Sequence, residues 1–228
     1  MLVPTQETNV WNVFDYLADH THTPLPDTTW YTALEHAAPD ELFTLGLHAQ
    51  HVAPAVAETI YRRAADAGDT DAMSLLGMLL AEQDRDAEAE PFLRRAADAG
   101  DTDAVLLAVL LEKAGRTEEA EAFYRQAADT GHAAAMHGLG NLLHVTHRAD
   151  EAKLFYRQAA DGGQTGALFN LGFILHKAGR SGEAEPLLRR AAKKGHAGAI
   201  LCLGTLLVDQ GRAEEAKPFY RRVAQTDA

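Results

Sequence analysis

The sequence predicts an all-α fold, a right-handed superhelical solenoid built from antiparallel helix hairpins. One observation behind this prediction is a repeat, since Tyr124, Tyr156 and Leu188 follow one another at a spacing of 32 residues in similar stretches. A second is that each stretch holds two apolar segments with helical spacing, such as those around Leu171 and Leu188. A fixed period of this length is typical of a repeat array, in which neighbouring hairpins stack to bury their apolar faces.

The repeat accounts for most of the chain. The clear copies span Tyr61–Phe92, Leu93–Phe123, Tyr124–Phe155, Tyr156–Leu187 and Leu188–Phe219, and a truncated copy starts at Tyr220. We therefore assign residues 61–228 to five repeats with a C-terminal helix. Residues 1–60 precede them as a capping helix and a degenerate repeat in one continuous solenoid domain, because terminal repeats of a solenoid are atypical.

The first 60 residues do not follow the repeat pattern closely. Val10–Leu17 is expected to form a short helix with an apolar face. Trp30–Ile60 is interpreted as a degenerate repeat because its Leu45-Gly46 pair precedes Leu76-Gly77 by 31 residues. Two roles stay open for this segment: it caps the end of the solenoid, or the helix containing Trp11 folds into the groove and inhibits binding. The cap is the preferred interpretation.

Local residues mark the expected helix ends. Thr117 and Ser181 stand where the N-cap of a second helix is expected. A left-handed C-terminal cap needs a residue without Cβ, and a glycine follows an Ala-Ala-x-x run at five such places. These glycines are Gly68, Gly100, Gly131, Gly163 and Gly195. Acidic residues precede arginines by four positions on the second helices, which predicts a solvated outer face. The pairs are Glu90/Arg94, Glu121/Arg125 and Glu185/Arg189.

These motifs resemble two families of helical repeats. Leu-Gly, followed by a Gly-Arg-x-x-Glu-Ala turn and Tyr-x-x-Ala, is similar to the tetratricopeptide repeat. The Ala-Ala-x-x-Gly-x-x-x-Ala-x-x-x-Leu-Gly segment at Ala127–Gly140 resembles the Sel-like repeat, and the period here is shorter than in either family. The resemblance covers residues 61–228 and implies a non-enzymatic scaffold whose first helices line a concave face that binds a segment of a partner protein.

Groove residues follow from this resemblance by counting from each Leu-Gly pair. The expected set is Met78, His137, Asn141, His144, Phe169, Asn170, Phe173, His176, Cys202 and Thr205. Asn141 and Asn170 fall on positions that resemble the peptide-gripping asparagines of tetratricopeptide domains that clamp a C-terminal carboxylate. The basic members of that clamp are replaced, with His137 where a lysine is expected, so the resemblance implies gripping of a peptide backbone.

Histidines in the same groove support other hypotheses. His137, Asn141 and His144 share one helix face, and His176 repeats the position of His144 one copy later. A second hypothesis is therefore an enzyme that uses this histidine-rich groove with a small molecule or a metal, and a third is a peptide-sensing regulator. Stacked repeats separate equivalent side chains by about 10 Å, which is long for one metal ion. We therefore expect no metal ion here. We also expect no cofactor and no catalytic residue.

The composition of the chain indicates which classes of partner to expect. The 228 residues carry a net charge of −12 without a basic stripe, so we expect a protein or peptide partner and no nucleic acid. A single cysteine, Cys202, and the absence of a signal-like pattern in residues 1–10 indicate a cytoplasmic protein. No apolar run reaches the length needed to cross a membrane. The C-terminal end near Tyr220 has no covering helix, which makes a homodimer through that end a further hypothesis.

Overall fold

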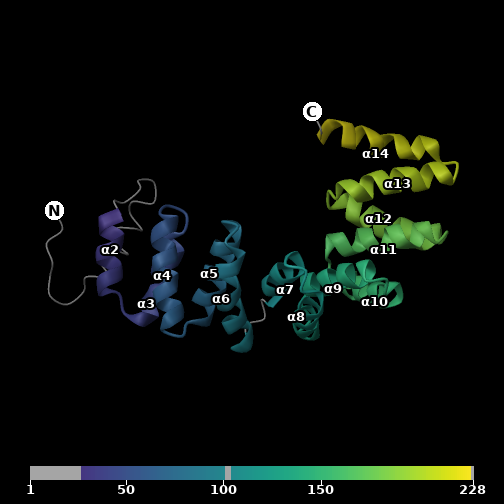
Figure 1. The fold of residues 1–228 in the computed structure, drawn as a ribbon. Coiled ribbons are helices and arrows are strands. Elements are labelled where there is room, and N and C mark those ends of the chain that lie inside the picture. Colours follow the sequence, from purple (N-terminus) through teal and green to yellow (C-terminus); the bar gives the residue numbers. More distant parts are fainter. Residues whose placement is uncertain (1–26, 101–103, 227–228) are drawn as a thin grey trace. The chain divides into compact units, whose positions relative to one another are not determined.

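The structure, a computed structural model, describes residues 27–100 and 104–226 (Figure 1). Within these ranges the chain forms helices and turns and contains no strand, which confirms the all-α prediction. The expected capping helix Val10–Leu17 lies outside the described residues. The helices are α2 (Asp27–His36), α3 (Pro39–Ala49), α4 (Pro54–Asp66), α5 (Thr70–Glu82), α6 (Asp86–Asp98), α7 (Ala104–Lys113), α8 (Thr117–Asp129), α9 (Ala133–Val145), α10 (Ala149–Asp161), α11 (Thr165–Lys177), α12 (Ser181–Lys193), α13 (Ala197–Asp209) and α14 (Ala213–Thr226).

The helices separate into two compact units. The first unit ends at Leu110 and the second begins at Leu111, so the boundary falls within α7. In the first unit α3 packs on α4, α4 on α5 and α5 on α6, while α2 contacts α3 and α4. Trp30 of α2 is buried, and Gly46 of α3 lies against the ring of Tyr61. None of the described helices combines the length and the apolar character that crossing a membrane requires.

In the second unit consecutive helices pack in chain order from α8 to α14. In addition, α9 contacts α11, and α11 contacts α13, so the first helices of successive hairpins lie beside one another. The Leu-Gly glycines permit the close packing inside each hairpin. A Cβ added to Gly140 would lie 2.7 Å from the ring of Tyr156, and one on Gly172 would lie 2.8 Å from Leu188. This packing places α9, α11 and α13 on a common face.

The expected glycine caps are confirmed. All five have a left-handed backbone, with φ values of 96° at Gly68, 92° at Gly100, 88° at Gly131, 85° at Gly163 and 89° at Gly195. The expected N-caps are wrong, because α8 begins at Thr117 and α12 at Ser181, so the N-cap residues are Arg116 and Arg180. Each of these arginines instead reaches the glutamate three residues later, Glu119 or Glu183, at 2.7 Å.

The second helices carry a ladder of partly exposed ion pairs. The predicted pairs Glu90–Arg94, Glu121–Arg125 and Glu185–Arg189 are confirmed, at 2.8, 2.8 and 2.7 Å. The ladder also joins neighbouring hairpins, since Arg148 contacts Glu121 at 2.8 Å and Glu151 at 2.7 Å. One step differs, because Lys153 occupies the position of Glu121 one repeat later and pairs with Asp150 on its own helix.

Candidate functional site

Helices α9, α11 and α13 line two adjacent pockets on their common face, which we call the α9–α13 groove. The first pocket has a volume of about 310 Å³ and is lined by Asn141, His144, Val145, Tyr156, Phe169, Asn170, Phe173 and Ile174. The second has a volume of about 250 Å³ and is lined by Phe169, Phe173, His176, Lys177, Gly198, Leu201, Cys202 and Thr205. Phe169 and Phe173 belong to both pockets and therefore separate them. All the predicted site residues except Met78 and His137 line one of the two.

A hydrogen-bonded amide pair occupies the floor of the first pocket. The Asn141 Oδ1 accepts a bond of 2.9 Å from the Tyr156 hydroxyl and one of 2.8 Å from the Asn170 Nδ2. The same Asn170 Nδ2 lies 3.1 Å from the His137 Nε2. Four side chains from α9, α10 and α11 thus form one network, in which His137 is hydrogen-bonded to Asn170 and its ring centroid lies 6.1 Å from that of Tyr156.

The repeat spacing explains why the two asparagines meet. Asn141 follows the Leu-Gly pair of α9, whereas Asn170 precedes the Leu-Gly pair of α11. Asn170 therefore stands 29 residues after Asn141, three short of the 32-residue repeat. On neighbouring first helices this offset is close to one helical turn, which brings the two carboxamides side by side.

Burial controls the protonation of the network. The ring of His137 is packed against Gly166 of α11, where an added Cβ would lie 2.6 Å from its Cε1. Desolvation lowers the pKa of His137 below 6.5, and the nearby His196 lowers it further. Burial also raises the pKa of Tyr156 to about 12. At neutral pH the network therefore consists of a neutral imidazole, two amides and a protonated phenol.

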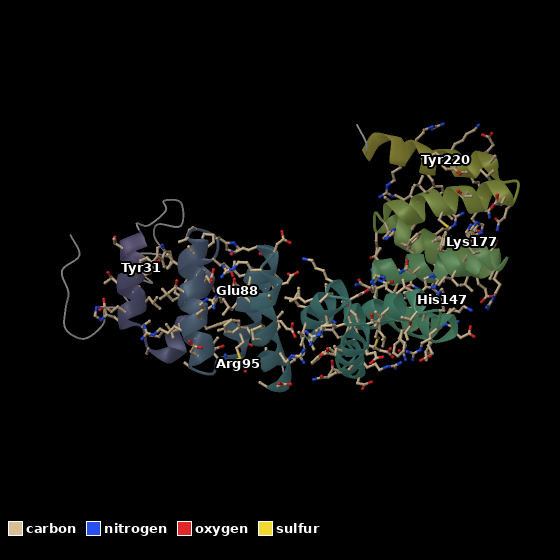
Figure 2. All side chains as sticks on the ribbon, in the orientation of Figure 1. Tyr31, Glu88, Arg95, His147, Lys177 and Tyr220 are labelled. Carbon is tan, nitrogen blue, oxygen red and sulfur yellow. The ribbon has the colours of Figure 1, made fainter. Side chains whose placement is uncertain are left out.

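Aromatic side chains form the wall between the pockets. The ring centroids of Phe169 and Phe173 are 5.9 Å apart, and the His196 ring stacks on Phe169 at 4.6 Å. The Lys177 ammonium lies 5.7 Å from the centre of the Phe173 ring, a cation–π arrangement (Figure 2 labels Lys177). An apolar group entering either pocket would contact this wall.

The predicted histidine face does not converge on one point. His137 takes part in the amide network, whereas His144 is exposed beside the first pocket. His176 turns toward Asp209, with 3.5 Å between Nε2 and Oδ2, and its Nδ1 lies 3.5 Å from the Ser181 hydroxyl. Within residues 27–100 and 104–226, no three histidine, cysteine, aspartate or glutamate side chains are placed to hold a metal ion.

The remaining predicted residues divide between the units. Cys202 lines the second pocket, and burial raises the pKa of its thiol, although the Lys177 charge opposes this shift. The Thr205 hydroxyl donates to the Leu201 carbonyl of its own helix at 3.1 Å. Met78 lies on α5 in the first unit with 39% of its surface exposed, and it lines neither pocket.

Three contributors were missed by the sequence analysis. Tyr156 marks the repeat spacing in the sequence, and its hydroxyl completes the amide network. His196 follows the cap glycine Gly195, and its Nδ1 accepts a bond of 3.2 Å from the Ala199 N–H and so caps α13, while its ring stacks on Phe169. Lys177 was not considered. Its position, one residue after His176 on a groove helix, was the available signal.

Comparisons with known proteins agree with the architecture. Tetratricopeptide repeat models match residues 53–104, 104–133 and 165–190. No curated protein matches the chain significantly. Among solved structures, c5321, a protective antigen of uropathogenic Escherichia coli strains displaying an SLR fold, matches with a TM-score of 0.77 and 21% identity. That match covers 86% of this chain and 48% of c5321, so the chain spans about half of that relative.

Two further structures extend the comparison. A Sel1 repeat protein from Oxalobacter formigenes matches with a TM-score of 0.67 and 22% identity, over 93% of this chain and 96% of the other. YrrB, a TPR protein with an unusual peptide-binding site, matches with a TM-score of 0.50 and 21% identity, over 67% of this chain and 81% of the other. The helix hairpins, the glycine caps and these matches together show an α-helical repeat fold like that of tetratricopeptide and Sel-like repeat proteins.

Proposed function

We propose that the α9–α13 groove binds an extended segment of a partner protein, which makes the chain a non-enzymatic interaction scaffold. The observation that carries the proposal is the amide pair at the floor of the first pocket. Asn141 retains its Nδ2 and Asn170 its Oδ1 without a hydrogen-bond partner among the described residues. One donor and one acceptor are what a residue in an extended backbone needs.

The pockets around the pair suit the side chains of such a segment. An extended chain directs alternate side chains to the same side, so two side chains can enter neighbouring cavities. The two pockets share Phe169 and Phe173 and are bordered by apolar groups of Val145, Ile174 and Leu201. The backbone would supply affinity through the asparagines, while apolar side chains would supply selectivity.

A family relative gives independent support for this use of the fold. YrrB is a TPR protein with a peptide-binding site, and it matches 67% of this chain. At 21% identity the likeness concerns the fold alone, so the residues of this chain carry the rest of the proposal.

The test compares two carboxamide variants. Peptides are selected on the full chain from a phage-displayed library of random peptides, and the best peptide is synthesised and titrated by calorimetry. Asn141→Ala combined with Asn170→Ala should weaken binding of that peptide about tenfold or more, because two hydrogen bonds of about 1 kcal/mol each are lost.

Gln158→Ala is the matched control, since it removes an exposed carboxamide of α10 outside the groove and should leave the affinity unchanged. Circular dichroism checks that the variants keep their helix content. Equal affinity of the double variant and the unsubstituted chain would remove the asparagine pair from the site.

A further inference from the structure

We infer that His137 sets the order of donor and acceptor in the Asn141–Asn170 pair, and thereby the direction in which a peptide crosses the α9–α13 groove. The inference rests on the proposed function, and it assigns a specificity-determining role to a residue that does not line either pocket. The two asparagines alone do not determine which of them presents a donor to the groove and which an acceptor. Each carboxamide can turn to present either its oxygen or its NH₂ group.

The hydrogen bonds around the pair determine which asparagine presents a donor and which an acceptor. The Asn141 Oδ1 accepts from both the Tyr156 hydroxyl and the Asn170 Nδ2. The Asn170 Nδ2 has two hydrogens, one directed at Asn141 and the other at the His137 Nε2, 3.1 Å away. That nitrogen must therefore accept, which requires a neutral imidazole with its proton on Nδ1.

The surroundings of His137 support a neutral ring. Elements α8, α10 and α11 pack against α9, and they bring Tyr124, Tyr156 and Asn170 close to this part of the helix. His196, the N-cap of α13, is the only other titratable group that shifts His137 among the described residues, and it disfavours the protonated ring. No carboxylate in the described part of the chain stabilises an imidazolium at this position.

The alternative order is chemically complete and depends on the same residue. With a proton on Nε2, His137 would donate to the Asn170 Oδ1. Both carboxamides would then turn over, and the Asn141 Nδ2 would donate to Asn170 and to the Tyr156 oxygen. His137 thus distinguishes two networks that use the same four side chains.

The order defines a chain direction. In the observed network the groove presents an acceptor on α11, the Asn170 Oδ1, and a donor on α9, the Asn141 Nδ2. In an extended chain one residue directs its N–H and its C=O to the same edge, with the N–H nearer the N-terminus. A peptide held by both groups therefore runs from α11 toward α9, and its N-terminal part lies over the second pocket, next to Leu201 and Lys177.

The first test needs no ligand. Long-range ¹H–¹⁵N correlation spectra of the full chain labelled with ¹⁵N-histidine report which nitrogen of each ring carries the proton. At pH 8 we expect His137 to be the Nδ1–H form, and the signal is assigned by its absence in His137→Gln. A proton on Nε2 would overturn the inference whatever the groove binds.

The second test measures the direction. The probe is the capped peptide acetyl-Ser-Leu-Ser-Leu-Ser-amide, carrying a nitroxide at either its N-terminal or its C-terminal end. The N-terminal label should broaden the Leu201 methyl signals on α13 more than those of Val145 on α9, and the C-terminal label should do the reverse. The opposite pattern would overturn the direction while leaving peptide binding in place.

Two variants test whether His137 determines the direction of the bound peptide. His137→Gln replaces the ring with a carboxamide that can turn either group to Asn170, so the broadening ratio of Leu201 to Val145 should approach one for both labels. His36→Gln changes an exposed histidine of α2, outside the groove, and it should keep the original ratio. A retained ratio in His137→Gln would overturn the role of His137.

The two proposals fail in different ways. If neither labelled peptide broadens any groove signal, peptide binding fails for this probe, and the tautomer spectrum alone decides the order of the amide pair. If broadening occurs with equal ratios in the unsubstituted chain, peptide binding stands and the directional inference is wrong.

Discussion

Helices α5 and α9 occupy the same place in their hairpins but present different chemistry. Both have 13 residues, and both start with a side-chain cap, from Asp69 in α5 and from His132 in α9. Both bring the glycine of a Leu-Gly pair against the following helix, Gly77 against Leu93 and Gly140 against Tyr156. The residues that hold the hairpin together are therefore equivalent.

The residues on the groove side are not equivalent. Positions 74 and 78 of α5 are serine and methionine, whereas the matching positions of α9 hold His137 and Asn141. His137 and Asn141 belong to a network that reaches Asn170 on the neighbouring first helix. The comparison teaches that packing and groove chemistry use different positions of one repeat, so either can change without the other.

The largest expected effect comes from breaking the shared packing. Gly140→Ala would place a Cβ about 2.7 Å from the Tyr156 ring, whose hydroxyl donates a hydrogen bond to Asn141. The ring must shift, so we expect the free energy of unfolding to fall by about 1–3 kcal/mol and the amide network to lose the tyrosine bond. Urea unfolding measures the first effect.

Gly182→Ala is the control, because an added Cβ on that glycine of α12 meets no atom within 4 Å. Alanine is the better helix former, so this variant should gain up to about 1 kcal/mol. Equal stability changes of the two variants would contradict the packing role of Gly140.

A smaller effect distinguishes the turns that follow α5 and α9. Asp84 and His147 occupy the same turn position with φ of 58° and 63°, a left-handed backbone that glycines adopt in the later hairpins (Figure 2 labels His147). Because histidine tolerates this backbone less well than aspartate, His147→Gly should raise the free energy of unfolding by about 0.5–1 kcal/mol. Asp84→Gly should gain less. Thermal unfolding of both variants measures which one gains more stability. A larger gain in Asp84→Gly than in His147→Gly would contradict the prediction.

The stability of the second unit should depend on pH through His137, whereas α5 contains no histidine. The folded state holds a proton on His137 more weakly than the unfolded state does, because burial and His196 lower its pKa below 6.5. Protonation therefore favours unfolding, and stability should fall as the pH drops below about 6.5 toward the folded-state pKa.

In His137→Gln this part of the pH dependence should disappear. Urea unfolding at a series of pH values, compared between the variant and the unsubstituted chain, measures the difference. Parallel curves for the two proteins would show that His137 does not titrate differently on folding.

The smallest effect concerns the outer ladder. Lys153→Glu would place a carboxylate near Arg157 and Arg180, at the position that Glu121 occupies one repeat earlier. We expect a slight rise in the unfolding midpoint, smaller than that of His147→Gly, because the pair is exposed and screened by salt. Lys217→Glu, at the same repeat position in α14, is the control. A rise that persists in 1 M salt would argue against an ionic cause.

The scaffold could be predicted because each of its features depends on one position in a repeated unit. A glycine after Ala-Ala-x-x near the end of a second helix caps that helix, as at Gly163, and a glutamate four residues before an arginine meets it on the same helix. Such rules involve neighbours in sequence, and copies of the motif confirm one another. The two N-caps failed because Arg116 and Arg180 reach glutamates one turn later, a pattern that competes with a hydroxyl cap.

The candidate site could be predicted only as a set of positions. Asn141 and Asn170 were placed in the groove, but their contact depends on the one-turn offset between neighbouring first helices. Tyr156 belongs to a different helix, and the same residue packs on Gly140, so its hydroxyl gave no separate sequence signal. Hydrogen-bond order depends on three-dimensional contacts, which motif spacing does not encode.

The matched turns between hairpins make the α11–α12 hairpin an exchangeable cassette. Gly163 before it and Gly195 after it differ in φ by only a few degrees, 85° against 89°. A duplicated hairpin could therefore be inserted at either junction in register, without a new type of turn. Each insertion would add one first helix to the groove. The number of residues that the surface covers on an extended partner would then grow with copy number, through duplication of the hairpin.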